Sequence, residues 1–476
     1  MDYQETLNYL YESAPMFQQI GGKAYKPGIE TTLKLDKYFG HPHQQFKTIH
    51  IAGTNGKGSC SHTIAAVLQS AGYKVGLYTS PHLVDFRERI RINGEMIPEE
   101  YVVNFVEKHR TFFEPLYPSF FELTTAMAFR YFADQKVDVA VIEVGMGGRL
   151  DCTNIITPDV SVITNIGLDH MQYLGDTLTK IAIEKAGVIK ENIPVVVGRA
   201  SGAVKRVFTV KAKTMNSDII YAEHSAQSTS IHLLNIDDLI KRKTELSLLA
   251  ITEINDEACV NESIKAIDRF IETQKDALVI TNTEIKAELY FELNGNYQAE
   301  NCLTILSALS ILKKMGYTIR LKDYLKGFSS VCEMTGLTGR WQKLQSSPEI
   351  RCDTGHNADG FKYLSQQLQQ IHEKYHKELH IVFGMVNDKD IRSVLELLPK
   401  EATYYFTKAS VKRALHEDEL MRMALEYDLH GNAYPSVVEA VEEAKKNCLP
   451  KDFIFIGGSN FIVADVLTNR NTLNFH

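Results

Sequence analysis

The chain has 476 residues, of which 44% are hydrophobic, and its formal net charge is −7. A chain of this length is expected to form two or three domains around a large buried core. The acidic balance argues against a general nucleic-acid-binding protein, which normally carries a basic surface. It is compatible with a local basic pocket that binds an anionic substrate.

The seven cysteines and the first residues indicate a cytoplasmic protein. The cysteines are odd in number and none are spaced as C-x-x-C, so a reducing compartment suits them better than a disulfide framework or a zinc site. Residues 1–10 lack the apolar stretch of a secretory signal, and no apolar run is long enough to span a membrane. We therefore expect a cytoplasmic monomer that has neither nucleic-acid nor membrane partners.

A glycine-rich motif follows two helical pieces that residues 1–46 predict around a loop at residues 21–28. The apolar run at residues 48–52 predicts a strand, residues 53–59 hold three glycines and Lys57, and a helical pattern begins after them. Loop N–H groups, a helix N-terminus and a lysine together form a phosphate site. Ser59 is placed to offer its hydroxyl to Mg²⁺.

The spacing of this motif departs from the strict Walker A pattern. Residue 51 is Ile where the first glycine should stand, and Gly58 separates Lys57 from Ser59. The alternative interpretation is a glycine-rich turn with an incidental lysine. We favour phosphate binding.

Further apolar runs at residues 74–79, 137–145, 160–164 and 193–198 predict strands of a parallel sheet, with polar residues where they end. Ser80 and His170 follow two of these runs, and Glu143 lies near the end of another. A buried carboxylate is expensive unless it is paired or bound to metal, so a magnesium role is favoured over a salt-bridged core Glu143. For His170, a structural role and a metal role both remain open.

Two basic features in this half of the chain have two interpretations each. Residues 87–94 alternate charged and apolar side chains and end in Asn-Gly, which predicts either a solvated edge hairpin or a basic rim for an anionic substrate. Lys185 lies in an apolar stripe with Leu178, Ala182, Ala186 and Ile189 on a helix predicted over residues 177–190. It either snorkels to solvent or has a chemical function.

Residues 200–292 mix short strand-like pieces with a charged helix near 261–274, and no chemistry can be assigned to them. The turn residues at 293–298 predict a hinge. Strands are then expected near residues 350–353, 379–383, 403–406 and 453–456, each followed by polar or glycine-rich sequence. We expect two α/β domains, residues 1–296 and 297–476, whose strand ends face each other across a cleft.

Together these motifs resemble the folylpolyglutamate synthase/dihydrofolate synthase family of the Mur ligase superfamily. The resemblance covers about residues 20–200 and 293–460. The matching runs are Gly53 to Ser59, Thr79 to Leu83, Glu143 to Asp151, Leu168-Asp169-His170, Glu184 to Gly187, Asn301, Gly339-Arg340, Asp353-x-x-His356-Asn357, Gly384-Met385 and Asp388-Lys389-Asp390.

The resemblance implies a P-loop NTPase-like N-terminal domain of the Mur ligase central type and a smaller Rossmann-like α/β C-terminal domain. It implies ATP and Mg²⁺, with two ions expected. ATP contacts are expected from Thr54, Asn55, Gly56, Lys57, Gly58, Ser59, Asn301, Arg340, Asp353 and His356. Metal ligands are expected from Ser59, Ser80, Glu143, His170 and, if carbamylated, Lys185. Catalytic roles are expected for Lys57, Lys185, His170 and Arg340.

The same resemblance places Gly28, Ser119, Leu150, Asp151 and Cys152 at the pterin-substrate site, and Arg89 is our candidate for its basic rim. The implied reaction joins L-glutamate to dihydropteroate, to a (poly)glutamylated folate, or to both, through an acyl phosphate, and releases ADP and phosphate.

One departure from the family is Thr354-Gly355 with Ala358, where the pattern is often Asp-x-Ala-His-Asn-Pro. Three rival functions are weaker. A peptidoglycan-precursor ligase would carry a UDP-binding domain, for which the 52 residues before Gly53 are too few. A regulator without ligase activity would have no use for the metal-type residues and Lys185. A P-loop kinase would not displace Ser59 from Lys57.

Overall fold

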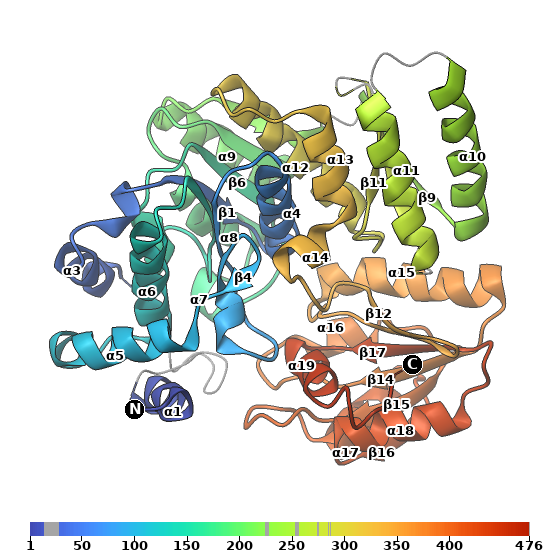
Figure 1. The fold of residues 1–476 in the computed structure, drawn as a ribbon. Coiled ribbons are helices and arrows are strands. Elements are labelled where there is room, and N and C mark those ends of the chain that lie inside the picture. The colour runs from blue at the N-terminus through green and yellow to red at the C-terminus, as the bar shows by residue number, and fades with distance from the viewer. Residues whose placement is uncertain are drawn as a thin grey trace.

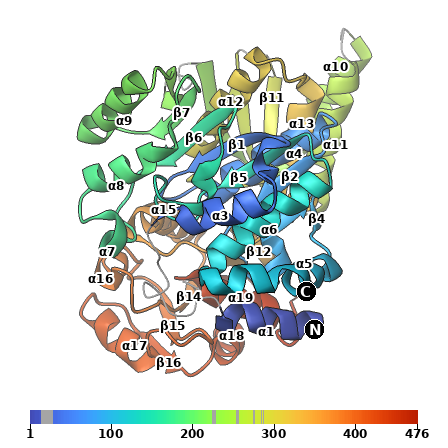
Figure 2. The same ribbon diagram turned by 90° about the vertical axis from the view of Figure 1, so that its left-hand side faces the viewer.

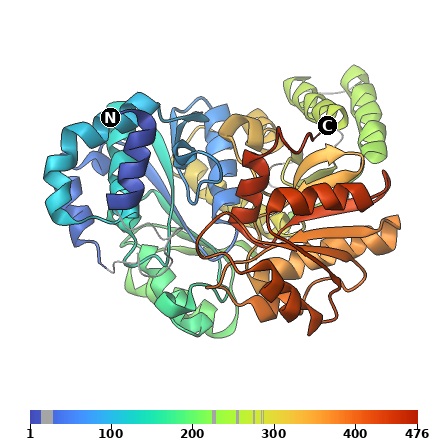
Figure 3. The same ribbon diagram turned by 90° about the horizontal axis from the view of Figure 1, so that it is seen from below.

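The computed structural model describes residues 1–13, 28–223, 228–252, 257–273, 276–283, 285 and 287–475. It contains two α/β bodies and a small side lobe (Figure 1). The N-terminus lies on the first body and the C-terminus on the second (Figure 3). The α/β class and the two-part architecture predicted from the sequence are confirmed.

The first body is built on an eight-stranded sheet in the order β4-β3-β2-β5-β1-β6-β7-β8. All pairs from β2 to β8 are parallel, and the hairpin β3–β4 adds an antiparallel edge. Five of the six residues of the central β1 are buried, as its apolar sequence predicts. The strands are β1 Lys47–Ala52, β2 Val75–Tyr78, β3 Ile90–Ile92, β4 Glu95–Met96, β5 Val139–Glu143, β6 Val160–Asn165, β7 Val195–Arg199 and β8 Ile219–Tyr221.

Helices cover both faces of this sheet (Figures 1 and 2). One face packs against α4 (Lys57–Ser70), α12 (Gln298–Lys314) and α13 (Leu321–Ser329), with aliphatic side chains of β1, β5 and β6. The other packs against α3 (Glu30–Tyr38), α5 (Glu99–Phe113) and α6 (Phe120–Asp134), through an aromatic-rich core. Period-two alternation along the strands sends side chains to both cores.

The second body has a six-stranded sheet in the order β12-β13-β17-β14-β15-β16, parallel except for β12. Helices α15 (Ala358–Tyr375) and α17 (Glu417–Leu425) cover one face, and α18 (Val437–Asn447) and α19 (Asn460–Thr468) cover the other. The strands are β12 Gln342–Ser346, β13 Glu349–Cys352, β14 Leu379–Phe383, β15 Thr403–Thr407, β16 Gly431–Tyr434 and β17 Phe453–Gly457. The four predicted strands are present; β12 and β16 were not predicted.

The domain boundary differs from the one expected at the turn before residue 297. Helices α12, α13 and α14 (Val331–Thr335) contact α4, and α12 also contacts β6 and β7 of the first sheet. The turn therefore separates two parts of the same body, because the helices after it complete the apolar core of that body. We propose that the boundary lies after α14, close to residue 338.

The later part of the segment without assigned chemistry forms the side lobe, whereas β8 in its first part belongs to the first sheet. Strands β9 (Thr229–Leu234), β10 (Ala277–Asn282) and β11 (Ala287–Phe291) make an antiparallel sheet, with β10 in the middle. Helices α10 (Ile236–Thr252) and α11 (Glu257–Glu272) pack on it through a separate core, and α11 also contacts α13. In Figure 1 the lobe lies beside α13, and the lower end of α11 is next to α15 of the second body. Among the described residues, no helix is long and apolar enough to cross a membrane.

Candidate active site

A cavity of about 330 Å³ lies between the two bodies, where the carboxyl ends of both sheets meet. It is lined by every candidate site residue of the sequence analysis except Gly28, which precedes α3 and is not among the lining residues. Residues 21–27 of the same predicted loop lie outside the described part of the chain. The first body contributes Thr54 to Ser59, Ser80, Arg89, Ser119, Glu143, Leu150, Asp151, Cys152, His170, Lys185 and Asn301, and the second contributes Arg340, Asp353 and His356.

The glycine-rich loop connects β1 directly to α4, as the motif predicts. Gly53 and Gly56 have φ values of 146° and 83°, which side-chain-bearing residues rarely adopt. A Cβ at Gly56 would lie 2.3 Å from the amide oxygen of Asn301. The loop backbone is therefore held tightly against α12. Ser59 accepts a hydrogen bond of 3.1 Å from the side-chain amide of Gln298 in the same helix.

Two lysines share one carbonyl of this loop. The Lys57 ammonium donates to the carbonyl oxygens of Gly53 and Thr54, each at 3.1 Å, and the Lys185 ammonium donates to that of Gly53 at 2.8 Å. Burial lowers the pKa of Lys57. Burial, followed by repulsion from Lys57, lowers the pKa of Lys185 to about 7. With 4% of its surface exposed, Lys185 does not snorkel to solvent.

Part of the helix prediction around Lys185 is wrong. Helix α8 (Leu178–Lys185) ends at the lysine and continues as a 3₁₀ turn, Ala186–Val188. Leu178 is exposed, although Ala182, Ala186 and Ile189 are buried as predicted. The stripe is apolar only around its lysine end, since the first turn of α8 faces solvent.

Glu143 ends β5 and is 4% exposed. Its carboxylate accepts a hydrogen bond of 3.1 Å from the backbone N–H of Ser80, and no salt bridge to it is present in the described part of the chain. Burial raises its pKa, although the nearby charges of Lys57 and Arg340 act in the opposite direction. The described residues therefore include no ion-pair partner for Glu143, which the interpretation as a salt-bridged core residue would require.

Asp169 joins the two bodies. It lies 2.5 Å from the Lys389 ammonium and 3.3 Å from His356 Nε2, and it accepts from the Asn357 amide at 3.4 Å. Despite burial, the adjacent imidazole of His170 and the Lys389 ammonium hold its pKa well below the usual range of a carboxylic acid. A second bridge is the reciprocal amide pair of Asn55 and Asn357, at 3.1 and 3.0 Å.

His170 follows the strand β6 and begins the short helix α7 (Met171–Leu174) with a left-handed φ of 51°. Burial lowers its pKa to about 3, so the imidazole is neutral near pH 7 and can serve as a metal ligand. His170 and Glu143 line the same cavity. Neither belongs to a group of three or more His, Cys, Asp or Glu residues whose ligand atoms lie within 4.8 Å of one another in the described part of the chain.

Asp353 orders the wall contributed by the second body. Its carboxylate accepts hydrogen bonds from the Tyr297 hydroxyl at 2.6 Å, the Trp341 N–H at 2.7 Å and the Gly355 N–H at 2.8 Å. Burial nevertheless raises its pKa. Arg340 donates to the Thr354 hydroxyl and lies beside the loop, because a Cβ at Gly58 would be 3.4 Å from its guanidinium.

The remaining lining residues form a more apolar end. Arg89 is 3% exposed, donates to His82 at 2.7 Å and covers the ring of Phe120, so the prediction of a solvated edge hairpin is wrong for this arginine. Ser119 caps α6. Asp151 accepts from the backbone N–H groups of Met146 at 2.9 Å and Thr153 at 3.0 Å.

The comparisons with known proteins agree with this arrangement. Residues 51–309 match the Mur ligase middle domain, and residues 339–460 match the Mur ligase glutamate ligase domain. The dihydrofolate synthase/folylpolyglutamate synthase of Bacillus subtilis is 30% identical over 93% of this chain and 94% of its own length. The folylpolyglutamate synthase of Lacticaseibacillus casei is 32% identical over 99% of both chains.

The chain belongs to the folylpolyglutamate synthase/dihydrofolate synthase family. It is thus an ATP-dependent ligase of the Mur ligase superfamily, as the motifs predicted. The probable bifunctional folylpolyglutamate synthase/dihydropteroate synthase of Haloferax volcanii is 29% identical over 98% of this chain, but the chain spans only 50% of that protein. The solved structure of Escherichia coli FolC in complex with DHPP and ADP has a TM-score of 0.76, with 25% identity and coverage of 99% and 98%.

Several residues in or beside the cavity were not among our candidates for this family's site. Asp169 and Lys389 line the cavity and Asn357 lies next to them; all three belong to the matching motifs, but only the fold shows that they meet across the two bodies. Tyr297 and Gln298 come from the turn interpreted as a hinge. These two polar residues lie just before Asn301, at the N-terminus of the helix that carries it. Because helix N-termini bind anions, the sequence could have indicated them as candidate site residues.

Proposed function

We propose that this protein joins L-glutamate to dihydropteroate, to a (poly)glutamylated folate, or to both, at the expense of ATP. Its relatives carry both names, and the E. coli structure contains ADP and DHPP. The observation that carries the proposal is one cavity lined by a phosphate loop, a buried strand-end carboxylate and residues of both bodies.

We assign the nucleotide to the side of the cavity formed by the loop and by the second body. Thr54 to Ser59 surround the phosphates with N–H groups, and Lys57 and Arg340 neutralise charge on the transferred phosphoryl group. Asn301, Asp353 and His356 contact the remainder of ATP. Support comes from the placement of these residues on facing walls of one cavity.

The chain contains side chains suited to Mg²⁺. Glu143 is a buried carboxylate without a salt bridge among the described residues, and Ser59 and Ser80 line the cavity with it. We propose that these three oxygen donors hold one Mg²⁺, and that His170 with a carbamylated Lys185 holds a second. When bound, the ions neutralise phosphate charge and orient the γ-phosphoryl group.

Lys185 has the properties that carbamylation requires. The reaction with carbon dioxide needs the neutral amine, and burial lowers the pKa of Lys185 to about 7. The product is a carboxylate at the end of the side chain, with one proton released. It would replace a buried cation next to Lys57 by an anion, and so remove the repulsion between the two ammonium groups.

The proposed reaction has two steps. The substrate carboxylate attacks the γ-phosphorus of ATP, and the bond between that phosphorus and the bridging oxygen of the β-phosphate breaks. The products of this step are an acyl phosphate and ADP. The glutamate amine then attacks the acyl carbon, loses a proton and expels inorganic phosphate. The protein positions the reactants and stabilises charge through Lys57 and Arg340.

We assign the pterin substrate to the more apolar end of the cavity. Ser119, Leu150, Asp151 and Cys152 line it together with Phe120, and Arg89 supplies a buried positive charge. Gly28 is not among the lining residues, and its contact with the pterin substrate stays a prediction.

One assay tests the function. Purified protein is incubated with ATP, Mg²⁺ and L-glutamate, with dihydropteroate and tetrahydrofolate offered separately, and products are weighed by mass spectrometry. Addition of one glutamate residue to either acceptor, with an equal amount of ADP, is the expected result. ATP hydrolysis without ligation to either acceptor would contradict the proposal.

We further propose a cytoplasmic, monomeric enzyme. The seven cysteines all lie in the described part of the chain and form no disulfide there, which agrees with a reducing compartment. Sedimentation at micromolar concentration tests the monomer, and fractionation of the source cells tests the location.

A further inference from the structure

A second cluster of candidate ligands lies at the opposite edge of the C-terminal sheet. His380 is at the amino end of β14, and Cys448 and Asp452 flank the loop that leads from α18 into β17. Ligand atoms of these three residues lie within 4.8 Å of one another. The active-site cavity is at the carboxyl ends of the same strands, about 15 Å away for a five-residue strand.

We propose that His380, Cys448 and Asp452 form a binding site for a thiophilic divalent metal ion, with zinc as the best fit. One imidazole nitrogen, one sulfur and one carboxylate oxygen are typical zinc ligands, and water would occupy the fourth position. This differs in kind from the oxygen-rich site proposed for Mg²⁺. It also differs from the sequence analysis, where cysteine spacing alone indicated no zinc site.

The first argument is the geometry between His380 and Asp452. The imidazole Nε2 lies 3.7 Å from the Asp452 carboxylate oxygen, which is too long for a hydrogen bond. Two ligands of a tetrahedral zinc ion, with bonds of 2.0–2.2 Å, are about 3.4 Å apart. A shift of a few tenths of an ångström would therefore bring both atoms to ligand positions.

The second argument is an unsatisfied oxygen. Asp452 is 2% exposed, and one of its carboxylate oxygens has no hydrogen-bond partner among the described residues. The other oxygen, which is the one 3.7 Å from His380 Nε2, accepts from the N–H of Leu449 at 2.7 Å, and this hydrogen bond fixes the carboxylate. A buried carboxylate with an unpaired oxygen is costly, and a cation in contact with it would remove that cost.

The third argument is the support around the ligands. His380 Nδ1 lies 3.0 Å from the Tyr405 hydroxyl, so with Nε2 on the metal, Nδ1–H would donate to the tyrosine oxygen. This is the outer contact by which proteins orient a metal-binding histidine. Cys448 is partly buried between exposed neighbours, Asn447 and Leu449, which gives an ion a path from solvent.

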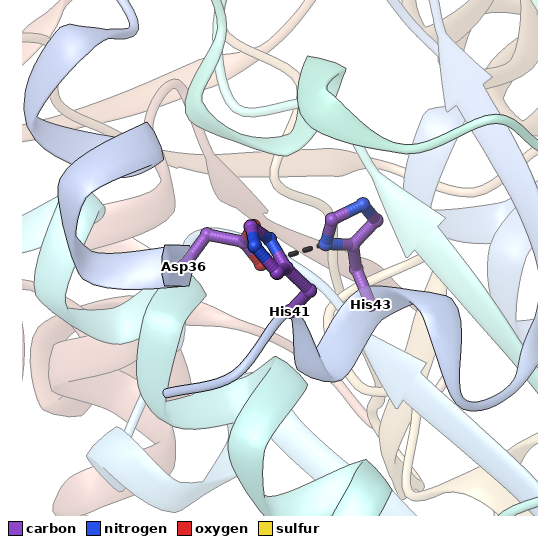
Figure 4. Close-up of side chains that lie close together, drawn as sticks. All are labelled: Asp36, His41 and His43. Carbon is purple, nitrogen blue, oxygen red and sulfur yellow. Dashed lines mark hydrogen bonds and ion pairs between the residues drawn. The ribbon is translucent and has the colours of Figure 1, made fainter. Parts of the chain in front are cut away.

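The cluster of Asp36, His41 and His43 lacks these properties (Figure 4). Each histidine Nδ1 lies 2.6 Å from a different oxygen of Asp36, so both oxygens are already hydrogen-bonded. This cluster is a histidine-capped carboxylate at the end of α3. It supplies a control that has histidine and aspartate side chains close together but no unsatisfied oxygen on its aspartate.

Cobalt(II) titration tests the site, since cobalt bound to thiolate gives an intense charge-transfer absorption in the near ultraviolet. Chelator-treated, full-length protein is titrated in saturating Mg²⁺, which occupies the oxygen-rich site. We expect the band to saturate at one cobalt per chain, and zinc to displace it. A cysteine binds metal as the thiolate, so ion binding releases the thiol proton and should tighten as the pH rises.

Variants assign the ligands. Cys448→Ser should abolish the band, and Asp452→Asn should weaken cobalt binding at least 10-fold. Cys332→Ser and His43→Ala should leave it unchanged. Thermal melts report folding: zinc should raise the melting temperature of the wild type and leave that of Cys448→Ser unchanged. Absence of a band from wild-type protein, or an unchanged band in folded Cys448→Ser, would overturn the proposal.

Discussion

Replacing Lys185 by Ala tests the chemistry that we assign to the most unusual lysine in the cavity. A lysine with a pKa of 10.5 is about 0.03% neutral at pH 7, whereas a pKa of about 7 makes about half of the amines neutral. The reactive form is thus enriched about a thousandfold. We expect kcat to fall at least 100-fold in Lys185→Ala, because the carbamate that would hold the second metal ion cannot form.

The matched control is Lys190→Ala. Lys190 is also a partly buried lysine, with a pKa lowered by burial to about 8 and a hydrogen bond of 2.8 Å to the carbonyl of Asn154, but it does not line the cavity. Its activity should stay within twofold of wild type. Wild-type protein in ¹³C-bicarbonate should show one carbamate carbon by NMR, absent from Lys185→Ala. Activity within threefold of wild type in Lys185→Ala would refute the reasoning.

Three further changes test the cavity. Glu143→Gln keeps the shape but removes the metal-binding charge, so ligation should fall at least 100-fold with an unchanged circular dichroism spectrum; retained turnover would contradict the metal assignment. Gly56→Ala places a Cβ 2.3 Å from the Asn301 amide oxygen, at a φ of 83° that alanine rarely adopts, so the phosphate loop must distort. The KM for ATP should therefore rise at least 10-fold. An unchanged KM would show that the loop relaxes without cost. Asp169→Asn removes the charge paired with Lys389, and small-angle scattering should show a more open molecule. The pKa of Asp169 is depressed in the folded protein, so its contribution to stability is present above the unfolded-state pKa of about 3.9 and is lost as the pH falls below that value. The opening should therefore also appear in wild-type protein in strong acid. If neither the variant nor acid opens the molecule, the Asp169–Lys389 pair does not hold the bodies together.

The sequence predicted the strands that carry the site because buried parallel strands are unbroken apolar runs. Residues 137–145 and 379–383 are clear examples, and both are strands in the structure. The polar residues after these runs predicted one shared edge, since parallel strands end together. The cavity contains Glu143 and Asp353 for this reason.

Contacts between distant segments could not be predicted in the same way. Asp169 is 188 positions from Asn357 and 220 from Lys389 in the chain, and local patterns carry no information on which partners the fold brings together. The domain boundary that we propose depends on the same kind of contact. A turn at residues 293–298 is a local signal, but the apolar face of α12 packs back onto the first body and so decides where it belongs.

The side lobe has a consequence for the nucleotide site although it contributes no residue to the cavity. Helix α11 leans on α13, and α13 in turn lies along α4, whose first residue is Lys57. Gly327 of α13 is so close to Val67 of α4 that a Cβ there would be 2.6 Å from the Val67 Cα. The lobe is therefore joined to the helix that starts at the phosphate loop by an unbroken series of packed helices, α11 on α13 and α13 on α4.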